Sequence, residues 1–119
     1  MQTHRKAILC LSDDTTMLRV RQMLFERFGY KVWSTNSLED VNRIAKSKRP
    51  DMLLMDNSFP GADPEQIAER VKSVCPDLVA VVLTPMFAVH NASESAVDRF
   101  VARDGSTDLM VAQIQELLG

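Results

Sequence analysis

The sequence predicts an α/β fold built as a doubly wound parallel sheet, and three observations lead to that prediction. Short apolar runs recur along the chain, each of a length typical of one strand. The runs are apolar continuously rather than alternately, which is typical of strands covered by helices on both faces. Segments with helical apolar spacing separate the runs, so the order β, α repeats five times and predicts right-handed crossovers.

Length and composition restrict the class of protein. The 119 residues match the common size of one domain, so residues 1–119 are expected to form a single domain. With 14 basic and 16 acidic residues the net charge is −2, which does not favour direct binding of nucleic acid or of an anionic membrane. The longest apolar run, Leu78 to Leu83, is far shorter than the roughly 20 residues of a membrane helix. We therefore expect a cytoplasmic protein, with Cys10 and Cys75 as reduced core thiols.

Five strands are expected. The strongest apolar runs cover residues 6–11, 51–55 and 78–83. Weaker runs cover residues 30–34 and 99–102. Because an edge strand is less buried than a central one, the weaker runs are predicted to form the two edges of the sheet.

The first predicted helix has signals at both ends. Asp14 or Thr15 can cap its N-terminus, and Gly29 can adopt the positive φ that ends a helix. Apolar residues spaced by three or four predict the face that packs on the sheet. That face contains Met17, Val20, Leu24 and Phe28.

Capping signals mark the next two helices. Ser37 and Asp40 resemble a capping box at the start of the second. Asp63 as N-cap, Pro64 at the first helical position and Gln66 two residues later mark the third.

The last helix begins after Ser106, which can cap it. Its apolar stripe consists of Val111, Ile114, Leu117 and Leu118. The preceding stretch, residues 85–97, has a broken apolar pattern and predicts at most a short helix.

Polar residues follow the predicted strands, at the edge of the sheet where ligands bind in such folds. Clustered Asp13 and Asp56 imply either a metal ion or an ion pair, and Mg²⁺ accepts a few oxygen ligands of this kind. Thr84 and Arg103 can bind the oxygens of a tetrahedral anion. The residues at this edge are Ser12, Asp13, Asp14, Asp56, Asn57, Ser58, Thr84, Pro85, Arg103 and Asp104.

An alternative role for these aspartates is to cap the helices that follow. This role is favoured for Asp14 and Asp63. It fits Asp56 less well, because a loop containing Pro60 and Gly61 separates Asp56 from the next helix.

Five stretches together resemble the receiver domain of two-component response regulators. They are ILCLSDD (8–14), FGYKV (28–32), PDMLLMDNSFPGAD (50–63), VVLT (81–84) and RFVAR (99–103). The third is the most specific, with an aspartate at the end of an apolar strand, a Pro-Gly turn and a second aspartate. The resemblance implies a flavodoxin-like (βα)5 receiver fold with strand order 2-1-3-4-5.

The resemblance also implies roles for individual residues. Asp56 matches the aspartate that accepts a phosphoryl group from a phosphohistidine of a kinase, with Mg²⁺ as cofactor. Asp13, Asp56 and the backbone carbonyl of Ser58 match the metal ligands. Thr84 matches the switch hydroxyl, and Phe100 the aromatic residue whose rotamer follows it.

Several residues depart from the family's pattern. Ser12 stands at the first acidic position of the family's pattern, so only Asp13 of the usual acidic pair remains. Asp14 is the candidate that could partly replace the missing acid as a metal ligand. Arg103 and Asp104 replace a Lys-Pro pair, which keeps a cation but changes its shape. Pro85 stands where a small residue is usual. The fourth helix is expected to be shortened or irregular.

Three hypotheses follow. The leading one is a phosphorylation-responsive domain of a two-component phosphorelay, partnered by a sensor histidine kinase or phosphotransfer protein, with an unknown output partner or a homodimer. It is no enzyme beyond self-catalysed transfer to Asp56. The alternative is a pseudo-receiver that binds proteins independently of phosphorylation. The third, an enzyme, is disfavoured because Ser58 replaces the second acid of a phosphohydrolase and no glycine-rich phosphate loop is present.

Overall fold

The computed structural model describes residues 5–84, 95–102 and 107–119. Its centre is one parallel sheet in the order β2-β1-β3-β4-β5, which confirms the predicted topology. The two weaker apolar runs form the edges, as expected. The strands are β1 (Ala7–Leu11), β2 (Lys31–Thr35), β3 (Met52–Asp56), β4 (Val79–Thr84) and β5 (Arg99–Ala102).

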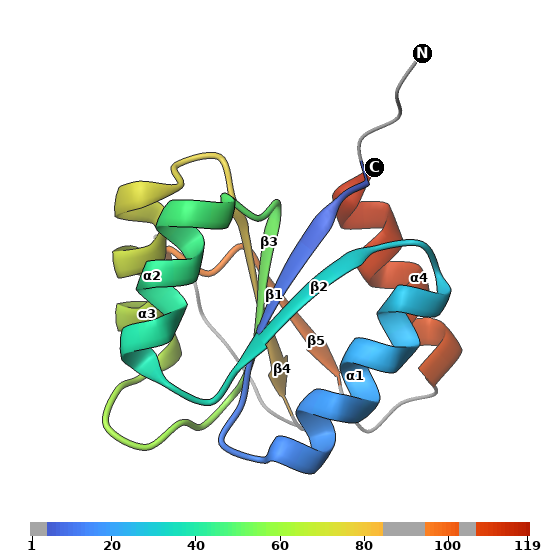
Figure 1. Ribbon diagram of the computed structural model, residues 1–119, viewed down its shortest axis with the longest axis horizontal. Coiled ribbons are helices and arrows are strands. Elements are labelled where there is room, and N and C mark those ends of the chain that lie inside the picture. The colour runs from blue at the N-terminus through green and yellow to red at the C-terminus, as the bar shows by residue number, and fades with distance from the viewer. Residues whose placement is uncertain (1–4, 85–94, 103–106) are drawn as a thin grey trace.

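Helices cover both faces of the sheet. They are α1 (Thr15–Arg27), α2 (Leu38–Lys48), α3 (Pro64–Val74) and α4 (Thr107–Leu118). Figure 1 shows α2 and α3 against one face and α1 and α4 against the other. No helix in the described part of the chain is long and apolar enough to cross a membrane. Most of the expected short or irregular helix lies at residues 85–94, outside the described residues, as does the predicted cap Ser106.

The strands alternate their side chains between two cores. Leu9 and Leu53 belong to the cluster under α2 and α3, whereas Ile8 and Leu54 belong to the cluster under α1 and α4. This alternation follows from the period of two in a strand, applied here to residues that are buried on either face. Asp56 comes two residues after Leu54, so its position faces α1 and α4.

The predicted buried face of α1 is wrong. Three of its four residues are exposed, namely Met17, Val20 and Phe28. The buried residues are instead Leu18, Arg21 and Phe25. Both sets have helical spacing, and a helix cannot bury both fully against one sheet. The structure buries the set containing an arginine because Asp56, on the sheet below, compensates its charge.

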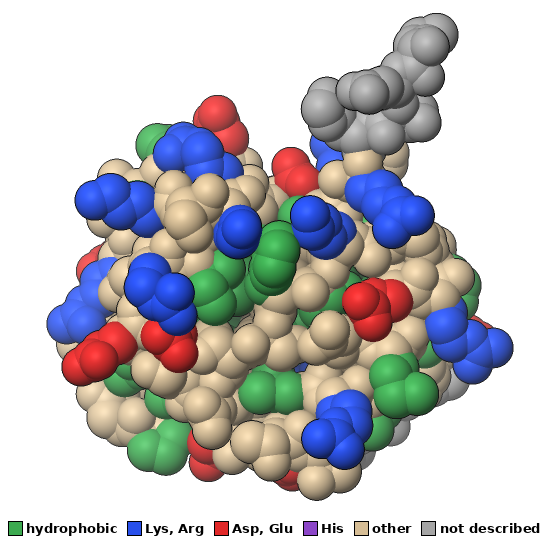
Figure 2. All heavy atoms as spheres, viewed as in Figure 1, with side chains coloured by type: hydrophobic (Ala, Val, Ile, Leu, Met, Phe, Trp, Pro, Cys, Tyr) green, Lys and Arg blue, Asp and Glu red, His purple; other side chains and the backbone are tan. Residues whose placement is uncertain are grey.

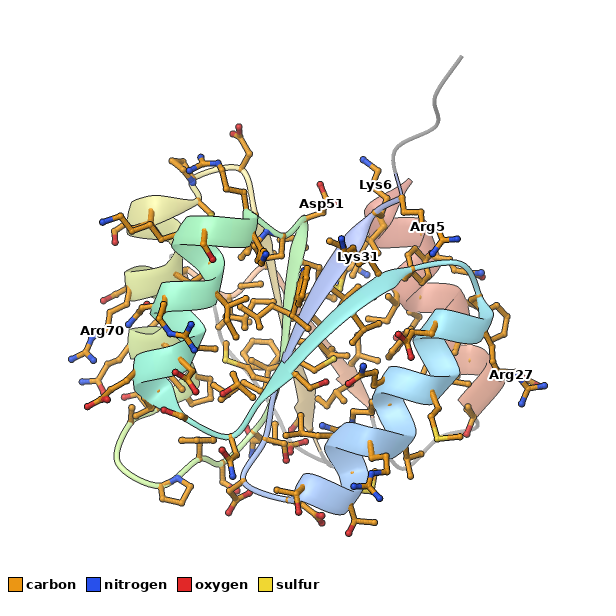
Figure 3. All side chains as sticks on the ribbon, in the orientation of Figure 1. Arg5, Lys6, Arg27, Lys31, Asp51 and Arg70 are labelled. Atoms are coloured by element: carbon orange, nitrogen blue, oxygen red, sulfur yellow. The ribbon has the colours of Figure 1, made fainter. Side chains whose placement is uncertain are left out.

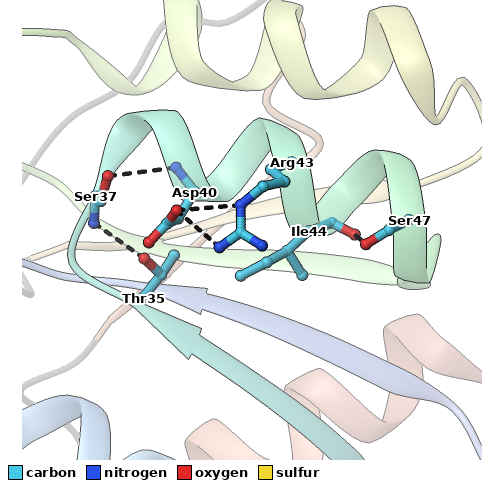
Figure 4. A network of polar contacts seen from close by, with 6 residues as sticks. All are labelled: Thr35, Ser37, Asp40, Arg43, Ile44 and Ser47. Atoms are coloured by element: carbon cyan, nitrogen blue, oxygen red, sulfur yellow. Dashed lines mark hydrogen bonds and ion pairs between the residues drawn. The ribbon is translucent and has the colours of Figure 1, made fainter.

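The start of α2 forms a polar network with only half of the predicted capping box (Figure 4). The Ser37 hydroxyl accepts a hydrogen bond from the Asp40 N–H at 3.3 Å, as expected for an N-cap. The Ser37 N–H donates to the Thr35 hydroxyl at 3.1 Å. The Asp40 carboxylate binds Arg43 at 2.9 Å, one helical turn further along.

The caps of α1 and α3 agree with the sequence. Asp14 caps α1 by accepting from the Met17 N–H at 3.1 Å. Gly29 follows the end of α1 with a φ of 92°, a conformation that glycine adopts without a steric cost. Asp63 and Gln66 form the complete capping box of α3.

The N-terminal end of the sheet carries mixed charge. The Asp51 carboxylate accepts from the Ala7 N–H at 2.8 Å, which ties the start of β3 to the start of β1. Figure 3 places Lys6, Lys31 and Asp51 at this same end. On the face drawn in Figure 2, basic and acidic side chains are interspersed, which is typical of a solvated surface. The candidate site lies at the opposite end of the strands.

Glu65 joins the first turn of α3 to the segment that enters β5. Its carboxylate accepts from the Ala96 N–H at 2.6 Å and from the Ser95 hydroxyl. These two hydrogen bonds lower the pKa of Glu65 from its ordinary value of 4.5, because they stabilise the charged form.

Replacement of Glu65 by glutamine is expected to cost stability mainly above pH 4.5, the ordinary pKa of this carboxyl. A lowered pKa in the folded state stabilises the fold above the unfolded-state pKa, and this contribution disappears as the pH falls through the folded-state pKa. Denaturant unfolding of wild type and Glu65→Gln should therefore differ most near neutral pH and converge in acid. Glu69→Gln, on the exposed side of α3, is the control. If the free energies of unfolding of wild type and Glu65→Gln differed by the same amount at every pH, the charge of Glu65 would not have the role assigned to it.

Candidate functional site

The carboxyl ends of β1 and β3 border a cavity of about 530 Å³. Asp13, from the loop after β1, lines it together with Asp56 at the end of β3 and Ser58 just beyond. The structure thus brings together the three residues predicted to share a site. Arg21 of α1 lines the same cavity and was not among the predicted residues.

Asp56 is a buried carboxylate with a protein partner at each oxygen. Its exposed fraction is 8%. Oδ1 accepts a hydrogen bond from Nη2 of Arg21 at 2.7 Å, and Oδ2 accepts from the Ser12 hydroxyl. A buried carboxylate requires such partners, because desolvation of an isolated charge is very unfavourable. The charge of Asp56 is therefore compensated from α1 and from the end of β1.

Ser12 connects the carboxylate to the start of α1. It is fully buried, and its hydroxyl oxygen accepts from the Asp14 N–H at 3.1 Å while its proton is donated to Asp56. At the position where the family's pattern has an acid, this chain therefore holds a neutral donor. Asp14, the other candidate acid, uses its carboxylate to cap α1.

Arg21 is a residue of this cavity that the sequence analysis did not predict. Its exposed fraction is only 4%, and its Nη1 is buried without a hydrogen-bond partner among the described residues. The sequence does contain a pattern that indicates burial of Arg21, because Leu18, Arg21 and Phe25 have the spacing of one helix face. An arginine within an apolar helix face indicates a buried anion opposite it.

Thr84 lies at the end of the neighbouring strand. It follows Leu83, whose Cα is paired in register with that of Asp56. Its exposed fraction is 5%, and its hydroxyl has no hydrogen-bond partner in the described part of the chain. A buried hydroxyl without a partner is uncommon and is free to donate to an anion.

The other predicted switch residues are only partly described. Phe100 lies on β5 and packs, partly buried, against the core cluster under α2 and α3. Arg103, Asp104 and Pro85 fall outside the described residues, so their predicted roles remain predictions.

The two cysteines are core residues, as predicted. Cys10, on β1, is fully buried, and burial raises the pKa of its thiol to about 12, although the nearby Arg21 charge acts in the opposite direction. Burial also raises the pKa of Cys75, whose thiol donates to the Ala45 carbonyl at 3.1 Å. Both thiols are therefore protonated near neutral pH and are poor nucleophiles.

The residues present do not fit a divalent metal ion at Asp56. Both carboxylate oxygens already have protein partners, and one of these partners is a cation. Ser12 supplies a hydroxyl that donates toward the carboxylate rather than a second charged ligand. No cluster of three His, Cys, Asp or Glu side chains suited to a metal occurs among the described residues.

A parallel sheet in this order, with an aspartate in a cavity at the end of its central strand, is the arrangement that the resemblance to receiver domains implied. The family model "Response regulator receiver domain" matches residues 8–115, and the chain belongs to this family.

Known relatives agree with this assignment. The chain is 23% identical over 114 residues to the transcriptional regulatory protein AfsQ1 of Streptomyces coelicolor, covering 94% of this chain and 51% of that protein. It thus spans about half the length of this regulator. A CheY-like receiver domain from Methanospirillum hungatei superimposes with a TM-score of 0.85 at 19% identity, covering 97% of this chain and 94% of that one.

A further structural neighbour is the response regulator TrrA of Thermotoga maritima. It has a TM-score of 0.80 at 19% identity, with 94% of this chain and 98% of that chain covered, in a crystal structure with Mg²⁺ and BeF. TrrA has also been crystallised in complex with the histidine kinase ThkA. At this level of identity the likeness shows the shared fold.

Proposed function

We propose that this chain is a phosphorylation-responsive receiver domain whose phosphoacceptor is Asp56. The observation that carries the proposal is the position of Asp56, a carboxylate at the end of β3 that lines the acidic cavity. The donor would be a phosphohistidine of a sensor histidine kinase or of a phosphotransfer protein. The kinase complex of TrrA supports this class of partner.

The chemistry is a phosphoryl transfer between two nucleophiles. An oxygen of the Asp56 carboxylate forms a bond to phosphorus while the P–N bond of the phosphohistidine breaks. The bonding electron pair goes to the imidazole nitrogen, and the product on this chain is an acyl phosphate. The chain contributes positioning and charge stabilisation, as is general for phosphoryl transfer. It is thus a regulatory domain whose only chemistry is transfer to its own aspartate.

Magnesium is the cofactor that the family implies, and TrrA was crystallised with Mg²⁺ and BeF. By the family's pattern its ligands would be Asp13, Asp56 and the backbone carbonyl of Ser58. Because Asp56 is already paired with Arg21 and Ser12, the proposed transfer does not depend on a metal ion at this carboxylate.

Signal output requires that phosphorylation change the protein surface. The Thr84 hydroxyl, which has no hydrogen-bond partner among the described residues, would donate to a phosphoryl oxygen, and Arg103 is proposed as a second donor. Movement of Thr84 would be followed by Phe100 on β5, and the altered surface would change binding of a partner or of a second copy of the chain. We place this cycle in the cytoplasm, where phosphohistidine donors of this kind act.

An NMR titration with beryllofluoride, an acyl-phosphate mimic, tests the proposed function. In buffer containing millimolar Mg²⁺, we expect saturable shifts of the Asp56 and Thr84 amides that extend to Phe100. The shifts should be lost in Asp56→Asn. No saturable response would overturn the proposal and leave a protein-interaction module that is independent of phosphorylation.

A further inference from the structure

The ion pair between Arg21 and Asp56 is the most buried pair of opposite charges in the described part of the chain. The other two ion pairs between described residues lie at the surface, where at least one partner is substantially exposed. An arginine with 4% exposure must be compensated by an anion, and Asp56 is the anion within hydrogen-bond distance, at 2.7 Å. The Arg21 guanidinium of α1 and the Asp56 carboxylate of β3 therefore compensate each other's charge.

The guanidinium also has donor capacity that Asp56 does not use. Nη2 binds Asp56, whereas Nη1 is buried without a partner among the described residues. Arg21 as a residue lines the cavity, and this second nitrogen belongs to the same planar guanidinium as the Nη2 that binds Asp56. Guanidinium groups bind tetrahedral oxyanions through pairs of N–H donors. A phosphoryl group on Asp56 would supply the missing acceptors.

The same arrangement disfavours a divalent ion. A metal bound to Asp56 would share the carboxylate with a guanidinium already 2.7 Å from Oδ1, and two cations that close repel in a poorly solvated site. Ser12 adds no negative charge to offset this repulsion. The charge of Asp56 that a metal ion would neutralise is already compensated by Arg21.

We propose that Arg21 is the resident cation of the Asp56 site and takes the place of a divalent metal ion there. The inference rests on the proposed function in that Asp56 is taken as the phosphoacceptor. Arg21 pairs with the carboxylate before transfer and donates to phosphoryl oxygens afterwards. The response of the domain to a phosphoryl mimic is therefore independent of metal, and a divalent ion and Arg21 compete for the same carboxylate.

Titration with Mg²⁺ alone, followed by two-dimensional NMR, tests the competition. In wild type we expect no saturable shift of the Asp13 and Asp56 amides at millimolar Mg²⁺. Arg21→Met removes the competing charge and should strengthen Mg²⁺ binding by about tenfold or more, which corresponds to about 1.4 kcal/mol. Arg19→Met removes the same charge from an exposed position of α1 and should behave as wild type. Arg21→Gln is a second neutral variant if the methionine variant does not fold.

Two outcomes would overturn the inference. One is saturable Mg²⁺ binding at Asp56 in wild type with an affinity that Arg21→Met leaves unchanged. The other is a beryllofluoride response of wild type that EDTA abolishes, because we expect that response to persist in EDTA. If the wild-type protein shows no NMR response to beryllofluoride, with or without Mg²⁺, the proposed function is refuted instead. The Mg²⁺ titration would still decide whether Arg21 excludes the metal ion.

Discussion

Replacement of Arg21 by methionine is expected to lower the free energy of unfolding by about 3–5 kcal/mol, the cost of breaking a buried ion pair by removing one partner. Methionine keeps much of the apolar stem of the arginine on the buried face of α1. Among the described residues, it leaves the Ser12 hydroxyl as the one side-chain partner of the buried Asp56. Urea denaturation at neutral pH, followed by circular dichroism, measures the loss.

Two further variants separate the charge effect from packing. Arg19→Met, at an exposed position of the same helix, should change stability by no more than about 0.5 kcal/mol. The double variant Arg21→Met with Asp56→Asn removes both charges and should recover a large part of the loss, because the remaining buried groups are neutral. Equal losses in Arg21→Met and Arg19→Met would show that the ion pair does not stabilise the fold.

Replacement of Asp56 by asparagine is expected to abolish covalent phosphorylation. An amide oxygen is a much weaker nucleophile than a carboxylate, and the product would not be a stable acyl phosphate. Incubation with phosphoramidate, a small phosphoryl donor, should add one phosphoryl group to wild type and none to Asp56→Asn. Intact-protein mass spectrometry measures the product, and hydroxylamine should remove it, as expected for an acyl phosphate.

The matched control is Asp14→Asn. Asparagine caps helices as well as aspartate does, so α1 should remain intact. If Asp14 only caps α1, this variant is phosphorylated like wild type. Undiminished labelling of Asp56→Asn would show that another residue is the acceptor, and circular dichroism of each variant establishes that the fold is retained.

Most of the sheet could be predicted from the sequence. The apolar runs at 51–55 and 78–83 became β3 and β4 with a shift of one residue, and the run at 99–102 became β5 without any shift. Such runs are informative because a strand covered on both faces excludes polar residues along its whole length. The Asp63 cap was equally predictable, because capping depends on residues that are neighbours in the chain.

The buried face of α1 was not predictable from hydrophobic spacing alone. Met17 and Val20 are apolar yet 39% and 51% exposed, while Arg21 is charged yet buried. Hydrophobic spacing assigns a helix face by local composition, whereas burial of a charge depends on what lies opposite it. Here the opposite group is Asp56, which is 35 residues away in the sequence.

By itself, the sequence determined the alternation of strands and helices, three helix caps, and the presence of Asp13, Asp56 and Ser58 at one edge of the sheet, whereas the strand order was implied by the resemblance to receiver domains. These features follow from local chain preferences and from the rules that connect parallel strands. Only the tertiary structure decided how the charge of Asp56 is compensated. That depends on which face of α1 lies over the end of β3, and in this protein that face brings Arg21 to the carboxylate.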